Sequence, residues 1–194
     1  MPSSLENISD SEEFKQFQAN VSRRMVDIGG VTWVYYEQGP RDMTPLVMIP
    51  GTSGTAEMFF LQILALGGRG YHVIACTPPA YWDHNAWVAG LHSFLSQFSY
   101  PKIHLFGTSL GGYLCLHYVS QHPEKVLSLV LCNAFCDTEP FYQSGLVVAS
   151  FGYMPEFWVK KYVLDSFPSK TDAPHVIDFI VEMFETLTRQ IVGH

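Results

Sequence analysis

The sequence lacks several features that would place it in a familiar class. It has no run of 18 apolar residues, and its uncharged stretch 140–155 is interrupted by Gln143, Gly145 and Gly152, so we expect no transmembrane segment. The net charge is −7 and no basic run occurs, which gives no reason to expect nucleic-acid binding. The first 20 residues are polar and acidic and contain neither the basic nor the apolar region of a secretory signal.

Cysteine is also scarce, and its pattern points to no disulfide framework. Four cysteines occur without a CxxC pair, and no histidine pair follows them at zinc-finger spacing: Cys76, Cys115, Cys132 and Cys136. We expect reduced, buried cysteines in a cytosolic protein. No other motif indicates a metal or a cofactor, so we expect neither.

What the sequence does contain is an alternation of strand and helix patterns in a chain long enough for one domain. Short apolar or β-branched runs predict strands at 31–36, 46–49, 71–76, 102–106 and 126–132. Apolar residues at helical spacing predict helices at 56–66, 87–98 and 112–121. The alternation predicts an α/β fold, with a parallel sheet covered by helices on both faces. Residues 12–25 fit either a short helix or an irregular arm.

The pattern changes after Cys132. Residues 138–175 are crowded with aromatic side chains and show no strand pattern, so we expect a helical insertion of the kind that forms a lid. Pro174 then begins a predicted helix that runs to about Val192. We treat residues 1–194 as a single domain.

One motif carries chemistry, the sequence Gly107-Thr108-Ser109-Leu110-Gly111. A G-x-S-x-G motif between a strand and a helix is the nucleophile elbow of α/β-hydrolases, a sharp turn that exposes the serine at the end of the sheet. Here KIHLF precedes the motif and GYLCLHYVSQ follows it. Gly107 and Gly111 are predicted to make room for the turn, and Ser109 is the candidate nucleophile.

Acyl transfer also requires backbone donors for the developing oxyanion. The N–H of Leu110, which directly follows the nucleophile, is one candidate. The N–H of Thr52, in the loop Pro50-Gly51-Thr52 after the strand at 46–49, is the other. An ordinary glycine-rich turn explains that loop equally well.

A serine nucleophile needs a histidine base and an orienting carboxylate, which follow the serine in the order acid, then histidine. Asp137 is a possible acid, although a helix cap or a solvated loop residue explains it better. Only His175 and His194 come later, and neither follows a predicted strand. Two further strand–helix units of roughly 30 residues each would use nearly all of the chain after Cys132, where the lid pattern already lies. We therefore expect the C-terminal core strands, and with them a complete triad, to be missing from this chain.

These stretches together resemble the maspardin family of divergent α/β-hydrolase-fold proteins. The resemblance rests on GTSGTAEMFFLQILALGGRGYHVIA, on YWDH at 81–84, on KIHLFGTSLGG, and on LVLCNAFCDT with the aromatic segment after it. It covers roughly residues 15–190, and Thr108 stands where that family has alanine. Members continue beyond this point, so we expect a fragment, a shortened isoform or a truncated gene product.

The resemblance implies a cytosolic protein, partly associated with endosomal and Golgi membranes, that binds the cytoplasmic tail of a T-cell coreceptor. Three interpretations remain open: a non-catalytic binding and regulatory adaptor, a serine esterase or lipase whose acid and base lie outside this chain, and a truncated product that does not fold stably. If the strand at 126–132 has no partner on its outer side, we also expect the isolated chain to self-associate.

Overall fold

The computed structural model describes residues 8–52 and 54–137. The predicted lid at 138–175, the predicted final helix and the histidines at 175 and 194 lie outside the described residues, and the single-domain assignment stays a prediction. Residues Ser11–Cys136 form one compact unit, to which the account below applies. Its helices are α1 (Glu12–Asn20), α2 (Phe60–Gly67), α3 (His84–Leu95) and α4 (Leu110–Gln121), with 3-10 turns η2 (Ala56–Phe59) and η3 (Pro123–Lys125); a further turn, η1 (Ile8–Asp10), precedes the unit.

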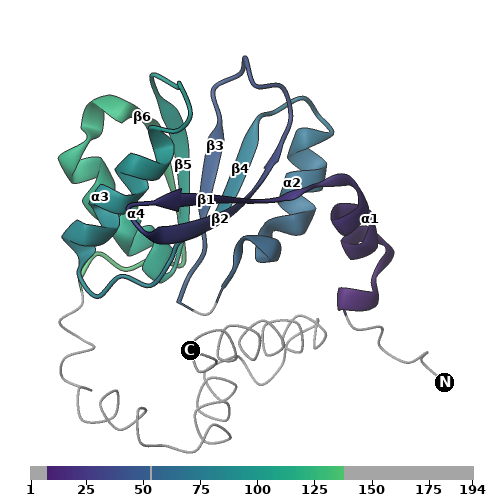
Figure 1. Ribbon diagram of the computed structural model, residues 1–194, viewed down its shortest axis with the longest axis horizontal. Helices are drawn as coiled ribbons and strands as arrows, with labels where there is room; N and C mark the ends of the chain where they lie inside the picture. Colours follow the sequence, from purple (N-terminus) through teal and green to yellow (C-terminus); the bar gives the residue numbers. More distant parts are fainter. Residues whose placement is uncertain (1–7, 53, 138–194) are drawn as a thin grey trace, which may run out of the picture. The chain divides into compact units, whose positions relative to one another are not determined.

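Six strands form one mixed sheet in the order β1-β2-β4-β3-β5-β6 (Figure 1). Their bounds are β1 Arg23–Ile28, β2 Val31–Gln38, β3 Leu46–Ile49, β4 Val73–Thr77, β5 Ile103–Thr108 and β6 Val126–Cys132. Strands β4, β3, β5 and β6 run parallel, as predicted. The sheet is therefore parallel-rich, and its antiparallel part lies at the other edge, where β1 and β2 form a hairpin and β2 pairs with β4 in the antiparallel direction.

One face of the sheet is covered by α3 and α4, which pack against each other (Figure 1). Leu91 and Phe94 of α3 and Tyr118 of α4 are buried there. They pack on alternate strand residues, because neighbouring residues of a strand point to opposite faces. The strand side chains of this core are Trp33, Val47, Ile49, Ile74, Cys76, Ile103 and Leu105.

The opposite face is covered by α1 and α2. Phe17 of α1 packs against Tyr36 of β2 with ring centroids 4.8 Å apart, and Phe14 meets Phe60 edge-on at 5.2 Å. Residues 12–25, which the sequence left undecided, therefore form a helix and the start of β1. Ser11 caps that helix by accepting a hydrogen bond from the N–H of Phe14.

The strand order places a topological switch point between β3 and β5. From β3 the chain crosses to β4 on one side, and from β4 it returns past β3 to β5 on the other side. Right-handed crossovers in opposite directions put α2 and α3 on opposite faces of the sheet. Ligands of open α/β sheets bind at the carboxyl ends of the strands at such a point. The loop after β3 and the turn after β5 meet at this position.

Candidate active site at the carboxyl edge of the sheet

Ser109 lies between the last residue of β5 and the first residue of α4. Its backbone has φ 50° and ψ −123°, a conformation that residues other than glycine rarely adopt. Its N–H donates to the carbonyl of Cys132 at 3.0 Å, and its own carbonyl accepts from the N–H groups of Gly112 and Tyr113. The turn is therefore held from the end of β6 on one side and from the first turn of α4 on the other. Its catalytic role stays a prediction.

The elbow glycines are required by close backbone contacts. A Cβ atom at Gly107 would lie 2.6 Å from the Cα of Gly112, and one at Gly111 would lie 2.2 Å from the carbonyl oxygen of Pro50. At Gly112 the added atom would lie 2.4 Å from the Cβ of Ala134, in the segment after β6. Any larger residue would push the elbow away from β3 or β6.

The loop after β3 reaches the serine through its glycine. A Cβ atom at Gly51 would lie 3.1 Å from the Cβ and 3.7 Å from the Oγ of Ser109, so the backbone before Thr52 passes directly beside the hydroxyl. The N–H of Leu110 begins α4, where the first N–H groups have no acceptor within the helix and the helix dipole favours negative charge. Both predicted oxyanion donors thus come from segments that border Ser109. Their function as donors stays a prediction.

Asn133 follows β6 and has φ 48°, a positive value that was not predicted from the sequence. A left-handed residue at this point turns the chain directly after the Cys132 carbonyl that holds Ser109. Asparagine tolerates this conformation better than most residues. The signal for the turn was therefore present in the sequence, as an asparagine at the end of a strongly apolar strand.

The histidines of the described residues are engaged elsewhere. His72 is buried and contacts the Glu37 carboxylate at 3.0 Å, while His104 bonds to the hydroxyl of Ser128 at 2.7 Å. The remaining four lie in two ring pairs between α3 and α4, with centroids 4.4 Å and 4.2 Å apart: His84 with His117, and His92 with His122. None has a contact with Ser109 among those that the described residues make.

Three further expectations concern a metal site, the candidate acid Asp137 and a membrane-spanning helix. No group of three or more His, Cys, Asp or Glu side chains lies close enough to hold a metal ion within residues 8–52 and 54–137. Asp137, the candidate acid, is exposed at the end of the described chain and has an interaction there. In the same part of the chain, no helix is both long and apolar enough to span a membrane.

The cysteines divide into two buried and two exposed residues. Cys76 and Cys115 lie in the core, and burial raises the pKa of both thiols above the usual value, so they stay protonated. Cys132 and Cys136 are free and exposed, so the prediction of buried cysteines is wrong for these two. Most side chains of β6 are exposed, and that of Cys132 is one of them.

Comparison with known proteins identifies the family to which the chain belongs. The sequence profile of the alpha/beta hydrolase fold matches residues 44–179. Rat maspardin is 42% identical over 190 residues, covering 93% of this chain and 72% of its own length. Human maspardin is 41% identical, covering 93% of this chain and 61% of its own length. The chain thus spans between about three fifths and about seven tenths of the length of these maspardins.

Solved structures agree at the level of the fold. The thioesterase domain from the curacin biosynthetic pathway superposes with a TM-score of 0.60 at 14% identity, over 85% of this chain and 67% of that domain. Epoxide hydrolase A from Mycobacterium thermoresistibile gives a TM-score of 0.52 at 24% identity, over 58% of this chain and 39% of its own. With the profile match, the identity to maspardin and a glycine-flanked serine at the switch point of the sheet, the chain belongs to the α/β-hydrolase fold family and, within it, to the maspardin-like proteins.

Proposed function

We propose that this chain acts as a binding and regulatory protein on a hydrolase fold and does not turn over esters through Ser109. The observation that carries the proposal is the engagement of the six described histidines. A serine is a weak nucleophile until a base within hydrogen-bond reach takes its proton. His72 and His104 bond to Glu37 and Ser128, and the other four lie between α3 and α4.

An exposed aromatic side chain in the loop after β4 supports a binding role. Trp82, in the loop between β4 and α3, is fully exposed, whereas the neighbouring Tyr81 accepts a hydrogen bond from the indole of Trp33 at 3.3 Å. Large aromatic side chains on a surface are frequent anchors of protein partners. By likeness to maspardin, the proposed partner is the cytoplasmic tail of a receptor, and the proposed location is the cytosol and endosomal membranes.

A second function, serine hydrolysis completed by residues outside this chain, is favoured by the backbone of Ser109. The φ of 50° costs on the order of 1–3 kcal/mol, and such strain persists mainly where it serves a function. Gly51 beside the hydroxyl and the start of α4 also suit an oxyanion.

The two functions are separated by a fluorophosphonate probe, which labels activated serines. We expect no labelling of the 194-residue chain above that of its Ser109→Ala variant, and no p-nitrophenyl ester hydrolysis that this substitution removes. The same measurement on a longer, full-length form tests the alternative. Labelling of the long form at Ser109 would support the hydrolase, and labelling of the short chain at Ser109 would contradict both its inactivity and the reasoning from the histidines.

A further inference from the structure

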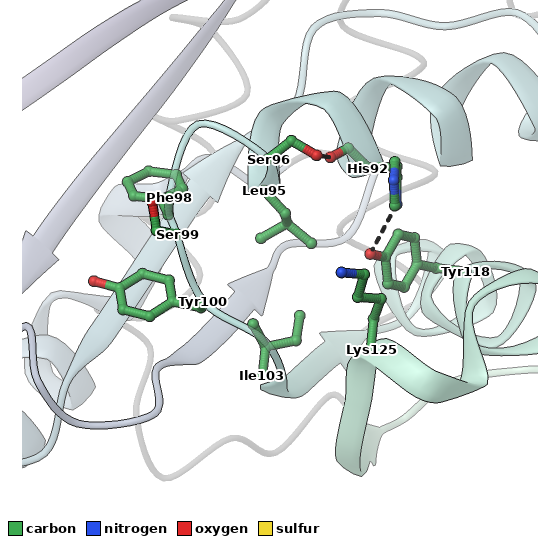
Figure 2. A pocket seen from close by; sticks show the side chains of 9 residues that line it. All are labelled: His92, Leu95, Ser96, Phe98, Ser99, Tyr100, Ile103, Tyr118 and Lys125. Atoms are coloured by element: carbon green, nitrogen blue, oxygen red, sulfur yellow. Dashed lines mark hydrogen bonds between the residues drawn. The ribbon is translucent and has the colours of Figure 1, made fainter.

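A second site lies at the other end of the sheet. A cavity of about 260 Å³ opens where β5 begins, whereas Ser109 follows its last residue (Figure 2). Six residues of strand separate the two ends by roughly 20 Å. The cavity is formed by the last turn of α3, the loop to β5, α4 and η3: His92, Leu95, Ser96, Phe98, Ser99, Tyr100, Ile103, Tyr118 and Lys125. The candidate active site uses none of these residues.

The cavity is lined by two basic side chains. Lys125 and His92 line it, and His122 stacks on His92 with ring centroids 4.2 Å apart. No carboxylate lines the cavity, and Lys125 forms no ion pair with the residues that the structure describes. Glu124, the nearest acidic residue in the chain, has a side chain that is 64% exposed and lies 3.9 Å from His122. The positive charge therefore lacks a buried counter-charge.

A hydroxyl group completes this basic wall. The hydroxyl of Tyr118 lies 3.5 Å from Nδ1 of His92, and Lys125 lines the same cavity (Figure 2). Burial, followed by the charge of Glu124, raises the pKa of Tyr118 to about 12, so the hydroxyl keeps its proton. When His92 is protonated, its Nδ1–H donates to the tyrosine oxygen, and the tyrosine O–H is free to donate to a ligand.

The opposite wall is apolar. Leu95 and Ile103 line it, and the rings of Phe98 and Tyr100 stack with centroids 6.1 Å apart at 18°. A ligand that fills both halves needs an anionic head and a small apolar body. The volume lies just below the range of drug-sized ligand pockets, so it suits a small molecule.

We propose that this cavity binds a small phosphomonoester, with the phosphate between Lys125, His92 and Tyr118 and the apolar group against Leu95 and Ile103. A phosphate offers three acceptor oxygens and up to two negative charges, which match an ammonium, an imidazolium and a phenol better than a carboxylate does. The site stands apart from Ser109 and does not depend on its activity.

Phenyl phosphate is the probe, and isothermal titration calorimetry on the 194-residue protein is the measurement. We expect saturable one-to-one binding, weakened at least tenfold in Lys125→Met, which keeps the apolar stem and removes the charge. Lys15→Met removes one positive charge from α1 on the opposite face and should leave the affinity unchanged. Phenol should bind at least tenfold more weakly than phenyl phosphate.

The role of His92 is tested by repeating the titration near pH 6 and pH 8 with His92→Gln. The groups that face His92 are Tyr118 and His122 from α4 and its cap, and Glu124 and Lys125 from η3. We expect the wild type to gain more affinity on acidification than His92→Gln, which lacks the imidazole at this position. If Lys125→Met does not fold, the His92 and Lys125 resonances of the wild type report the site directly. Equal affinity in Lys125→Met, equal binding of phenol, or shifts confined to other residues would overturn the proposal.

Discussion

At the scale of the single residue, the backbone conformation of Ser109 defines the elbow. Its positive φ is imposed by contacts on both sides, because its N–H bonds to Cys132 and Gly111 lies against the carbonyl of Pro50. A residue in this region costs on the order of 1–3 kcal/mol relative to relaxed backbone. The cost falls on the folded state alone, so substitution at this position can measure it.

We expect Ser109→Gly to be more stable than Ser109→Ala by about 1 kcal/mol, because glycine adopts φ 50° without a Cβ clash. Urea unfolding of both variants gives the difference in the free energy of unfolding. Asn133→Gly is the matched control, since Asn133 has φ 48° but asparagine tolerates that region, and its gain should be smaller. A Ser109→Gly variant no more stable than Ser109→Ala would show that the backbone at 109 is not strained.

Gly111→Ala should destabilise the fold by several kcal/mol. The added Cβ would lie 2.2 Å from the Pro50 oxygen and 2.7 Å from the Ile49 oxygen, and backbone atoms at the end of the central strand β3 and directly after it cannot move aside cheaply. Gly70→Ala provides the comparison, because Gly70 has φ 83° and open space around it, so only about 1 kcal/mol is expected there. Equal losses in the two variants, measured by thermal or urea unfolding, would contradict the contact with β3.

At the scale of the element, the sequence predicted strongly apolar strands better than charged ones. The apolar runs 46–49 and 126–132 match β3 and β6 residue for residue. β1 escaped prediction because RRMVDI is rich in charge and mostly exposed, so it has no apolar alternation to detect. It is stabilised by pairing with β2 across Gly29 and Gly30, both at positive φ, and this hairpin signal of two adjacent glycines was overlooked.

The contact between α3 and α4 is expected to make stability depend on pH. Burial, then the charges of His122 and Lys125, hold the pKa of His92 below its usual value, and burial and His84 do the same for His117. The unfolded chain therefore binds these protons more readily than the folded protein. The stability contributed by the neutral histidines is full above a pH of about 6.5 and is lost as the pH falls toward the lowered values.

We expect the melting temperature to fall between about pH 7.5 and about pH 5.5, and to fall less in His92→Gln. Differential scanning fluorimetry across this range measures both slopes. Asn85→Ala is the control, because Asn85 accepts a hydrogen bond from Gln121 between the same two helices and does not titrate. It should lower the melting temperature by the same amount at every pH. A His92→Gln variant with the slope of the wild type would refute the role of this histidine.

At the scale of the whole molecule, the alternation of strands and helices could be predicted from the sequence, but the order of the strands in the sheet and the meeting of distant segments could not. The G-x-S-x-G motif predicts a turn from its own five residues. The approach of Gly51 to Ser109 depends on β3 lying between β4 and β5, which no local pattern encodes. The cavity at the other end of the sheet could not be predicted from the sequence either, because His92 and Lys125 come together only through the packing of α3 on α4 and η3.

The outer side of β6 is an exposed edge of the sheet within the described part of the chain. β6 pairs with β5 on one side and has no second strand partner among the described residues. Leu127, Val130 and Leu131 are 51%, 47% and 43% exposed. A strand edge without a partner offers backbone hydrogen-bonding groups to another chain, and the exposed apolar side chains of β6 add apolar surface. We therefore expect the isolated 194-residue protein to self-associate through β6.

Size-exclusion chromatography with light scattering tests this expectation over a range of concentrations. Val130→Lys places a charge on the edge strand and should shift the protein toward the monomer. Leu61→Lys is the matched control, because Leu61 on α2 is 49% exposed and lies away from β6, so the same change in charge should leave the association unaltered. A wild-type protein that stays monomeric at all concentrations and melts cooperatively would contradict the prediction. Equal dispersal by both lysine variants would show that net charge, and not the edge of β6, controls association.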